Sequence, residues 1–349
     1  MAVQIVDLFC GVGGLSRGLL NVGLNVVAGY DIDPTCRYAY EHNNHVEYKI
    51  KNIREMDGQE ILDCFDQDAT KILVGCAPCQ PFSQMRFKLG KNNENDEKYD
   101  LLLEYGRMIN AVNPLIVSME NVPQIQKTTV YNEFIDLLEK NGYEHTEKVI
   151  YCADYGIPQS RRRFVLVASR LGEINIINPT HQRDEIHIRD FIGDLPAIAA
   201  GETDPTDPLH VSSSLSDKNL RRIRASVPGG TWRDWPEELQ CECHKKDSGR
   251  TYGSVYGRMT WDQIGSTITT QFYNYGTGRF GHPEQDRAIS LREGALLQTF
   301  PPDYDFIDPN SKFVFSDVAR HIGNAVPVKL GEIIGTSIIN HLRNNGIEV

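Results

Sequence analysis

The beginning of the chain combines an apolar segment, a glycine-rich turn and a helix start, and this combination restricts the fold most. Residues 4–9 have the near-continuous apolar character of a strand buried on both faces. The turn CGVGG follows at 10–14, and the spacing of apolar residues at 15–20 predicts a helix that ends near Gly23. This order lets backbone N–H groups approach a ligand closely. We therefore expect an α/β fold with a doubly wound, Rossmann-like parallel sheet.

The next predicted strand narrows the class of ligand. The strand at 25–30 ends in Asp31, twenty positions after Gly11, where a carboxylate can accept both hydroxyls of a ribose. The dinucleotide pattern G-x-G-x-x-G begun at Gly11 would need glycine where Ser16 stands. A pyrophosphate is therefore not required, and a nucleoside with a short zwitterionic tail, as in S-adenosylmethionine, fits at least as well. A purely structural turn is the alternative.

A second loop with reactive side chains follows the apolar segment 72–74, which predicts another buried strand. The sequence GCAPCQPFS at 75–83 places Cys79 and Gln80 between two prolines that restrict the backbone. A cysteine fixed beyond the carboxyl end of a parallel strand is typical of a nucleophile. Cys76 and Cys79 also have the C-x-x-C spacing of a redox pair or half a zinc site, and the loop alone does not separate these alternatives.

Two polar features follow along the chain. Residues 86–98 are polar and short of apolar anchors, which favours either a solvated loop or a lid over a substrate. Glu120 comes directly after the predicted strand at 114–119, on the rim where Cys79 is expected. A carboxyl group there could donate a proton, whereas a helix N-cap or a surface acid is the alternative.

Three consecutive arginines, Arg161, Arg162 and Arg163, lead into the strand predicted at 164–168. If strand alternation begins at the first of them, Arg161 and Arg163 face the same way. Two guanidinium groups on one face suit a phosphate, a carboxylate or a base carbonyl. A salt-bridged edge strand would use the same residues.

The composition excludes several classes of protein. With 349 residues, 24% charged and 40% hydrophobic, the chain is an ordinary globular protein with a sizeable core. It has no apolar run long enough to span a membrane and no basic region typical of a signal peptide at its start. Eight cysteines without framework spacing predict reduced thiols in the cytoplasm. The net charge of −11 argues only weakly against a nucleic-acid partner, because binding depends on local basic patches.

Six sequence blocks, taken together and in order, resemble the carbon-5 cytosine-specific DNA methyltransferase family. Each block alone is a weak or moderate match, but the ordered set covers nearly the whole chain. The blocks are DLFCGVGG at 7–14, PCQ at 78–80, ENV at 120–122, QSRRR at 159–163, RAISLRE at 287–293 and GNAVP at 323–327.

The resemblance implies S-adenosylmethionine as the cofactor, S-adenosylhomocysteine as its product, and no metal. Within the implied pocket, Asp31 would bind the ribose and Ile32 would cover the adenine without the stacking that an aromatic residue gives. Asn52 stands where family members often have an aspartate that contacts the adenine amino group, so the charge of that contact is lost. The residues assigned to the cofactor are Asp7, Phe9, Cys10, Gly11, Gly13, Gly14, Leu15, Asp31, Ile32, Asn52, Ile53, Pro78, Leu101, Asn324, Ala325 and Val326.

The resemblance also implies catalytic roles for Cys79, Gln80, Glu120, Arg161 and Arg163. Cys79 would add to carbon 6 of a cytosine flipped out of the duplex, which makes carbon 5 nucleophilic. Glu120 would hydrogen-bond ring nitrogen 3 and the exocyclic amine. Arg163, together with Arg161, would favour the thiolate and contact the base carbonyl.

The family organisation divides the chain into four segments. Residues 1–188 would form the first part of the catalytic and cofactor-binding domain, 189–286 a second, smaller, mostly β or irregular target-recognition domain, and 287–316 a bridging hinge. Residues 317–349 would return to the catalytic domain. Within the recognition segment, Cys241, Cys243 and His244 could ligate zinc, but no fourth ligand lies at a useful spacing, and we predict no metal site.

We therefore expect a cytoplasmic, monomeric enzyme that acts on double-stranded DNA and has no membrane partner. A cognate restriction enzyme or phage-defence protein is a candidate partner. The alternatives are a tRNA-methylating enzyme of the same family and, in a different class, a dinucleotide-dependent oxidoreductase. The long recognition segment favours duplex DNA over tRNA, and the missing third glycine argues against a dinucleotide.

Overall fold

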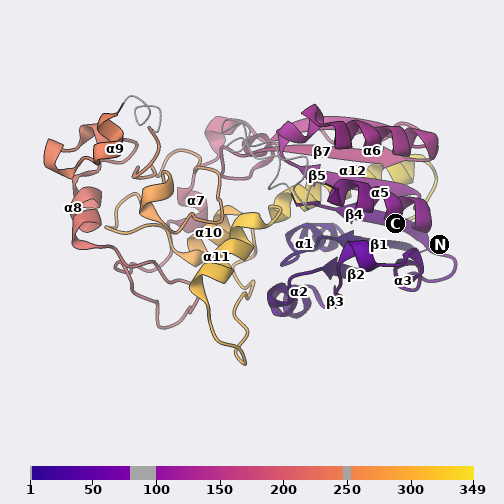
Figure 1. Cartoon of the computed structure of the whole chain (residues 1–349), viewed down its shortest axis with the longest axis horizontal. Helices are drawn as coiled ribbons and strands as arrows, with labels where there is room; N and C mark the ends of the chain where they lie inside the picture. Colours follow the sequence, from indigo (N-terminus) through magenta and orange to yellow (C-terminus); the bar gives the residue numbers. More distant parts are fainter. Residues whose placement is uncertain (1, 79–99, 247–252) are drawn as a thin grey trace. The chain divides into compact units, whose positions relative to one another are not determined.

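The computed structural model describes residues 2–78, 100–246 and 253–349, which form two compact units (Figure 1). The sheet unit comprises Met1–Tyr155, Arg162–Pro179 and Val326–Val349; the helix–loop unit comprises Gly156–Arg161 and Thr180–Ala325. The chain therefore passes between the units at four places. Cys79, Gln80 and the loop predicted at 86–98 lie outside the described residues.

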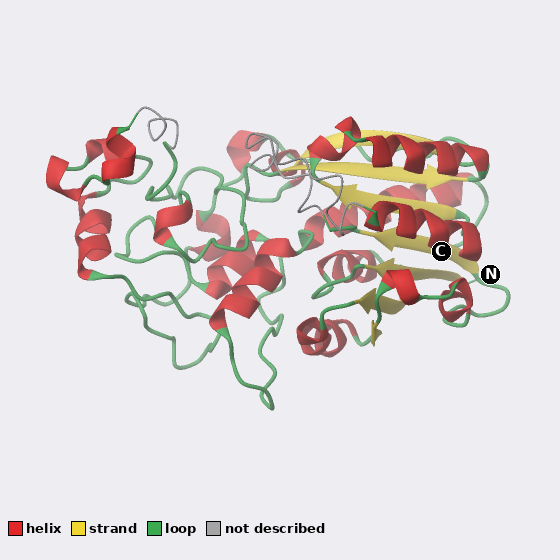
Figure 2. Cartoon of the chain, in the orientation of Figure 1, coloured by secondary structure: helices red, strands yellow, loops and turns green. Residues whose placement is uncertain are grey.

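The sheet unit is built on one seven-stranded sheet with the order β3-β2-β1-β4-β5-β7-β6. The first five strands are parallel, and β7 runs antiparallel to both β5 and β6. Helices lie on both faces of the sheet (Figure 2), so the predicted α/β, Rossmann-like fold is confirmed. The strands are β1 (Val3–Leu8), β2 (Asn25–Asp31), β3 (Glu47–Ile50), β4 (Thr70–Gly75), β5 (Ile116–Asn121), β6 (Glu144–Tyr151) and β7 (Arg162–Ser169).

One large apolar core joins the sheet to the helices of one face. Alternate strand residues such as Leu8, Leu73 and Met119 pack in it with Tyr105 of α5 and Phe134 of α6. The Tyr105 hydroxyl donates to the main-chain oxygen of Ser118, 2.9 Å away, which satisfies its polar end inside the core. The helices of the sheet unit are α1 (Gly14–Asn21), α2 (Arg37–Asn44), α3 (Gly58–Leu62), α5 (Leu101–Val112), α6 (Thr129–Lys140) and α12 (Val328–Asn344).

The first and last helices of the chain, α1 and α12, pack backbone to backbone. A Cβ atom on Gly18 would lie 2.2 Å from the main-chain oxygen of Val328, and one on Gly331 would lie 2.7 Å from that of Leu15. Only glycine allows this approach. Since α1 begins directly after the glycine-rich turn, the contact also fixes the position of that turn.

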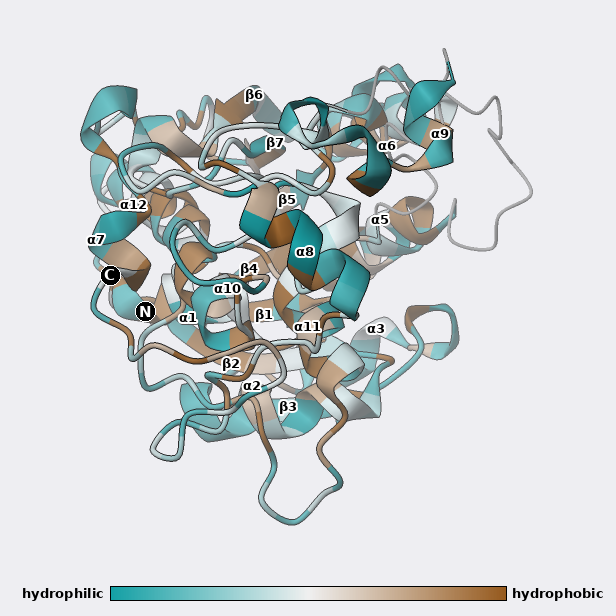
Figure 3. Cartoon of the chain, turned by 90° about the vertical axis from the view of Figure 1, so that its left-hand side faces the viewer, coloured by the Kyte–Doolittle hydropathy of each residue, from teal (hydrophilic) through white to brown (hydrophobic). Residues whose placement is uncertain are grey.

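The helix–loop unit consists of short helices and loops (Figure 2). Its described residues form isolated β-bridges but no strand of the seven-stranded sheet. A buried ion pair stabilises it: the Arg287 guanidinium lies 2.7 Å from the Glu293 carboxylate, and both side chains are fully buried. Helix α8 is mainly hydrophilic (Figure 3). The helices are α7 (Arg189–Ile192), α8 (Asp217–Ala225), α9 (Glu242–Lys245), α10 (Leu291–Leu297) and α11 (Phe315–Asn324).

Some element boundaries differ from those expected. Strand β3 ends at Ile50, and Asn52, which accepts a hydrogen bond from the Arg54 N–H, precedes a 3-10 turn, Ile53–Glu55. The strand expected at 114–119 continues to Asn121, so Glu120 lies within β5 and not beyond it. Among the described helices, none combines the length and apolar character that a bilayer crossing needs.

The assignment of 189–286 to DNA recognition stays a prediction. All described residues of that segment lie in the helix–loop unit, which also contains 287–325.

Replacing Gly18 with alanine should destabilise the protein strongly, because the added methyl group overlaps main-chain atoms that cannot rotate away. We expect a loss of about 2–4 kcal/mol in the free energy of unfolding, measured by urea denaturation. Asn21→Ala on the same helix is the control, since it removes one exposed hydrogen bond and should cost under about 1 kcal/mol. Equal losses in the two variants would contradict the backbone contact.

Candidate active site

Several predicted site residues lie at the carboxyl ends of parallel strands. The ladders pair Leu8 of β1 with Tyr30 of β2 and with Gly75 of β4, and Gly75 with Met119 of β5. The residues that directly follow Leu8, Tyr30, Gly75 and Met119 in the sequence are Phe9, Asp31, Cys76 and Glu120. Hydrogen-bond register alone therefore brings the ribose-binding candidate, the start of the glycine turn, Cys76 and Glu120 to one rim.

Asp31 is bonded to the backbone of the glycine turn. The Gly11 N–H donates to Asp31 Oδ2 at 2.9 Å, and the Asp33 N–H donates to Oδ1 at 3.0 Å. Burial raises the pKa of Asp31, although these backbone donors act in the opposite direction. Each carboxylate oxygen keeps a further lone pair for a hydroxyl group. Gly11 has φ +52°, and a Cβ atom there would meet no atom within 4 Å, so its main chain faces open space.

Ile32 and Asn52 both have side chains that solvent reaches, but the Asn52 amide is also hydrogen-bonded within its own turn. Ile32 is 64% exposed, which is unusual for a large apolar side chain. The Asn52 amide accepts from the Arg54 N–H at 3.2 Å and donates to Glu55 Oε1 at 2.9 Å. Its carbonyl oxygen is therefore occupied in the local turn, and one amide hydrogen stays available.

Asp7, assigned to the cofactor by resemblance, is buried beneath the turn. The Ser16 hydroxyl donates to Asp7 Oδ2 at 2.6 Å and lies 2.9 Å from the Tyr40 hydroxyl. Burial raises the pKa of Asp7 to about 7, and the Ser16 hydrogen bond offsets part of the effect. Ser16, which in the sequence only interrupts a dinucleotide pattern, is thus the partner that holds this carboxyl group.

The remaining predicted cofactor residues are spread over several elements. Four of them are buried in the glycine turn and at the start of α1: Cys10, Gly13, Gly14 and Leu15. Pro78 follows β4, Leu101 begins α5 and Ile53 is buried in the 3-10 turn. Asn324 and Ala325 belong to the helix–loop unit, and Val326 belongs to the sheet unit.

Glu120 is held by two charged or polar partners. Its side chain is 3% exposed; Arg163 Nε lies 2.8 Å from Oε1, and the Cys76 thiol donates to Oε2 at 2.8 Å. Next to it, the Asn121 amide donates to the main-chain oxygen of Ala77 at 3.1 Å. The ends of β4 and β5 are therefore cross-linked by side chains, which fixes where the chain leaves β4 toward Cys79.

Arg161 and Arg163 do not share a strand face, and the alternation interpretation is wrong in this respect. Strand β7 begins at Arg162, one residue later than that interpretation required. Arg161 is 2% exposed and belongs to the helix–loop unit, where it donates to the main-chain oxygens of Ile268 at 3.0 Å and Ala325 at 3.4 Å. Arg163 belongs to the sheet unit and lies against Glu120.

Comparison with known proteins identifies the family. The model of the C-5 cytosine-specific DNA methylase family matches residues 3–340. The chain belongs to this family. It is an enzyme, a DNA (cytosine-5-)-methyltransferase, which sets aside the oxidoreductase alternative.

Individual relatives agree with this assignment. The Type II methylase M.HgiDII of Herpetosiphon aurantiacus is 53% identical over 342 residues, which cover 97% of this chain and 95% of that protein. The Type II methyltransferase M1.BsuMI of Bacillus subtilis is 31% identical, with 95% and 79% covered. The structure of the Entamoeba histolytica methyltransferase EhMeth has a TM-score of 0.69 at 16% identity, covers 98% of this chain and 99% of that one, and supports the fold.

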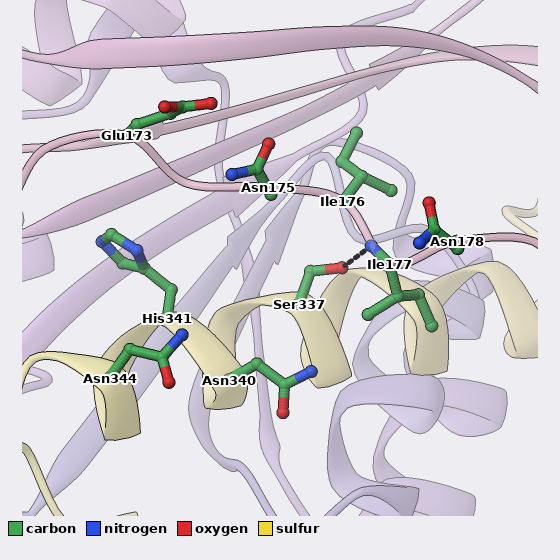
Figure 4. A pocket seen from close by; sticks show the side chains of 9 residues that line it. All are labelled: Glu173, Asn175, Ile176, Ile177, Asn178, Ser337, Asn340, His341 and Asn344. Carbon is green, nitrogen blue, oxygen red and sulfur yellow. Dashed lines mark hydrogen bonds between the residues drawn. The ribbon is translucent and has the colours of Figure 1, made fainter.

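The methyltransferase also has a polar pocket of about 420 Å³ in the sheet unit that involves none of the predicted site residues (Figure 4). Its His341 contacts Ser169 at 2.7 Å, and Ser169 pairs with Ile116 at the amino end of β5. The pocket therefore lies toward the opposite edge of the sheet from Glu120. Its lining residues are Glu173, Asn175, Ile176, Ile177, Asn178, Ser337, Asn340, His341 and Asn344.

The raised pKa of Asp7 predicts a pH-dependent stability. The folded protein binds this proton more tightly than the unfolded chain does, so the stabilisation is complete below pH about 4 and is lost as the pH rises through about 7. Between pH 5 and pH 8, the wild type should lose about 2–3 kcal/mol more than Asp7→Asn in urea titrations. Asp68→Asn, at an exposed position, should follow the wild type. The same pH slope for Asp7→Asn and wild type would contradict the burial effect.

Proposed function

We propose that the enzyme transfers a methyl group from S-adenosylmethionine to carbon 5 of a cytosine flipped out of duplex DNA, through a covalent bond between Cys79 and carbon 6. The observation that carries the proposal is the buried Glu120 carboxyl, oriented by Arg163 and Cys76 at the end of β5. Glu120 is on β5, which pairs directly with β4, the strand that leads to Cys79. Two cooperating groups on neighbouring strand ends suit addition to a heteroaromatic ring.

Cys79 would act first as the nucleophile. Its thiolate forms the sulfur–carbon 6 bond, and the electron pair of the carbon 5–carbon 6 double bond becomes available at carbon 5. After carbon 5 has gained the methyl group, loss of its proton to a base re-forms the double bond and breaks the bond to Cys79. The ring is then restored and the thiolate is free for another turnover.

Glu120 would hold the base during this sequence. Arg163 forms an ion pair with one of its oxygens and the Cys76 thiol donates a hydrogen bond to the other, so the carboxyl has a fixed orientation. The remaining lone pairs can meet the exocyclic amine and the protonated ring nitrogen 3, where charge changes as the thiolate adds. Arg163 is thereby a positioning residue for Glu120 as well as a source of positive charge. The catalytic roles of Arg161 and Gln80 stay predictions.

The turn residues fit S-adenosylmethionine. This cofactor supplies, when bound, an electrophilic methyl group on a sulfonium. Asp31 offers acceptors for the two ribose hydroxyls and is fixed by the Gly11 N–H. The open space beside Gly11 admits a ligand close to the main chain, and the exposed Ile32 gives an apolar surface for adenine.

The biological setting follows from the relatives. Both named relatives are Type II enzymes, which supports a role in a restriction-modification or phage-defence system. We infer that the enzyme acts as a monomer in the cytoplasm, and that the segment 189–286 reads the DNA sequence. Sequencing of methylated cytosines in DNA from cells that express the enzyme would identify that sequence.

Cys79→Ser should reduce methyl transfer to DNA by more than about a thousandfold, because an alcohol is far less nucleophilic than a thiolate. The variant should also fail to form a stable adduct with DNA that contains 5-fluorocytosine, whereas the wild type should be trapped. Cys76→Ser is the matched control: a hydroxyl can still donate to Glu120, so turnover should stay within about tenfold and trapping should persist. Trapping of Cys79→Ser, or its loss in Cys76→Ser alone, would move the nucleophile away from Cys79.

Ile32→Trp should tighten binding of S-adenosylhomocysteine, because an indole ring can stack on adenine where isoleucine only packs. The expected gain is about 0.5–1.5 kcal/mol, or roughly two- to tenfold in Kd by calorimetry. Ile32→Ala should weaken binding by a similar factor. Val149→Trp, at an exposed position on β6, is the control and should leave Kd unchanged. Equal Kd values for all three variants would place adenine elsewhere.

A further inference from the structure

Three metal-binding side chains that the proposed function does not use meet in the helix–loop unit. Cys241, Cys243 and His244 each offer a donor atom, and these three atoms lie within 4.8 Å of one another. Cys241 precedes α9 in extended backbone, and the other two are on its single turn. Both cysteines are free thiols. The sequence led us to expect no metal because a fourth ligand was missing, but it could not show that these three donors converge.

The spacing suits zinc. Zinc–sulfur bonds of about 2.3 Å and zinc–nitrogen bonds of about 2.0 Å place neighbouring donors of a tetrahedral site about 3.3–3.8 Å apart. Donors within 4.8 Å of one another reach this geometry by shifts of about 1 Å or less, which rotation about side-chain bonds supplies.

His244 gives an independent indication of a missing ligand. Its side chain is 5% exposed, and its Nδ1 atom has no hydrogen-bond partner among the described residues. A buried ring nitrogen is costly to leave without a partner, and a bound ion would satisfy it. The ring is also held in place: it stacks on Trp232 at a centroid distance of 4.3 Å and meets the edge of Tyr256 at 5.8 Å.

The sulfur of Cys241 accepts a hydrogen bond from a buried arginine. Arg222 of α8 donates from Nη2 to Cys241 Sγ at 2.9 Å, and from Nε to the main-chain oxygen of Leu239 at 2.9 Å. The guanidinium is buried and lies over the rings of Trp235 and Tyr256. This contact with the sulfur resembles the outer hydrogen bonds that orient metal ligands.

We propose that Cys241, Cys243 and His244 bind one Zn²⁺ ion, with water in the fourth position. Each thiol loses its proton to solvent on binding, so two thiolates and a neutral imidazole balance the charge of the ion. The ion ties α9 to the aromatic cluster of Trp232, Trp235 and Tyr256, and through Arg222 to α8. The site uses none of the residues assigned to methyl transfer.

The test uses the full chain, purified with reductant and stripped with a chelator. Titration with Co²⁺ should give one equivalent of bound metal and a sulfur-to-cobalt charge-transfer band, which excess Zn²⁺ removes. Cys241→Ser and Cys243→Ser should each lose about half of the band, since its intensity follows the number of thiolate ligands. Cys64→Ser, which changes a partly buried cysteine of the sheet unit, is the matched control and should keep it.

A second measurement uses the wild type alone, so that misfolding of a variant cannot explain its result. Zn²⁺ should protect Cys241 and Cys243 of the wild type, but not Cys64, from alkylation as read by mass spectrometry. Absence of a charge-transfer band in the wild type, an unchanged band in Cys241→Ser, or equal alkylation with and without Zn²⁺ would each overturn the proposal. So would a Cys241–Cys243 disulfide in the reduced preparation.

Discussion

The parallel hydrogen-bond ladder between β1, β2, β4 and β5 is the constraint on which the site depends. It puts Leu8, Tyr30, Gly75 and Met119 in one row, and whatever follows each of them must emerge at the same edge. Backbone pairing between the strands determines which side chains are neighbours at this edge. The polar contacts at that edge then set orientation within an arrangement that the sheet has fixed.

These contacts also carry energetic costs that the core must offset. Asp7 and Glu120 are both carboxyl groups almost without solvent exposure, and each relies on neighbouring donors to compensate for lost hydration. A site assembled from such groups is rigid only while the surrounding apolar packing is intact. Tyr105 of α5 lies in this core, and its hydroxyl donates to main-chain oxygens of both β4 and β5.

The sequence predicted several strands along the chain, the glycine turn and the acids near strand ends, because each is coded by local periodicity and by its neighbours. It did not predict the contact of Cys76 with Glu120, since residues 44 positions apart meet only once sheet order is known. The separation of Arg161 from Arg163 was missed for a smaller reason: it depends on whether a strand begins one residue earlier or later. The convergence of Cys241 with His244 depends on the conformation of a single helical turn, which no periodicity reveals.

The contact between α1 and α12 has a consequence for how the protein is made. Residues 14–21 leave the ribosome early, whereas their partner at 328–344 leaves more than 300 residues later. Until then the glycine face of α1 has nothing to pack against, and the sheet cannot close its layer on that side. The nascent chain must therefore hold an unfinished domain open while the entire helix–loop unit is synthesised, which makes translation the period of greatest exposure to aggregation and proteolysis.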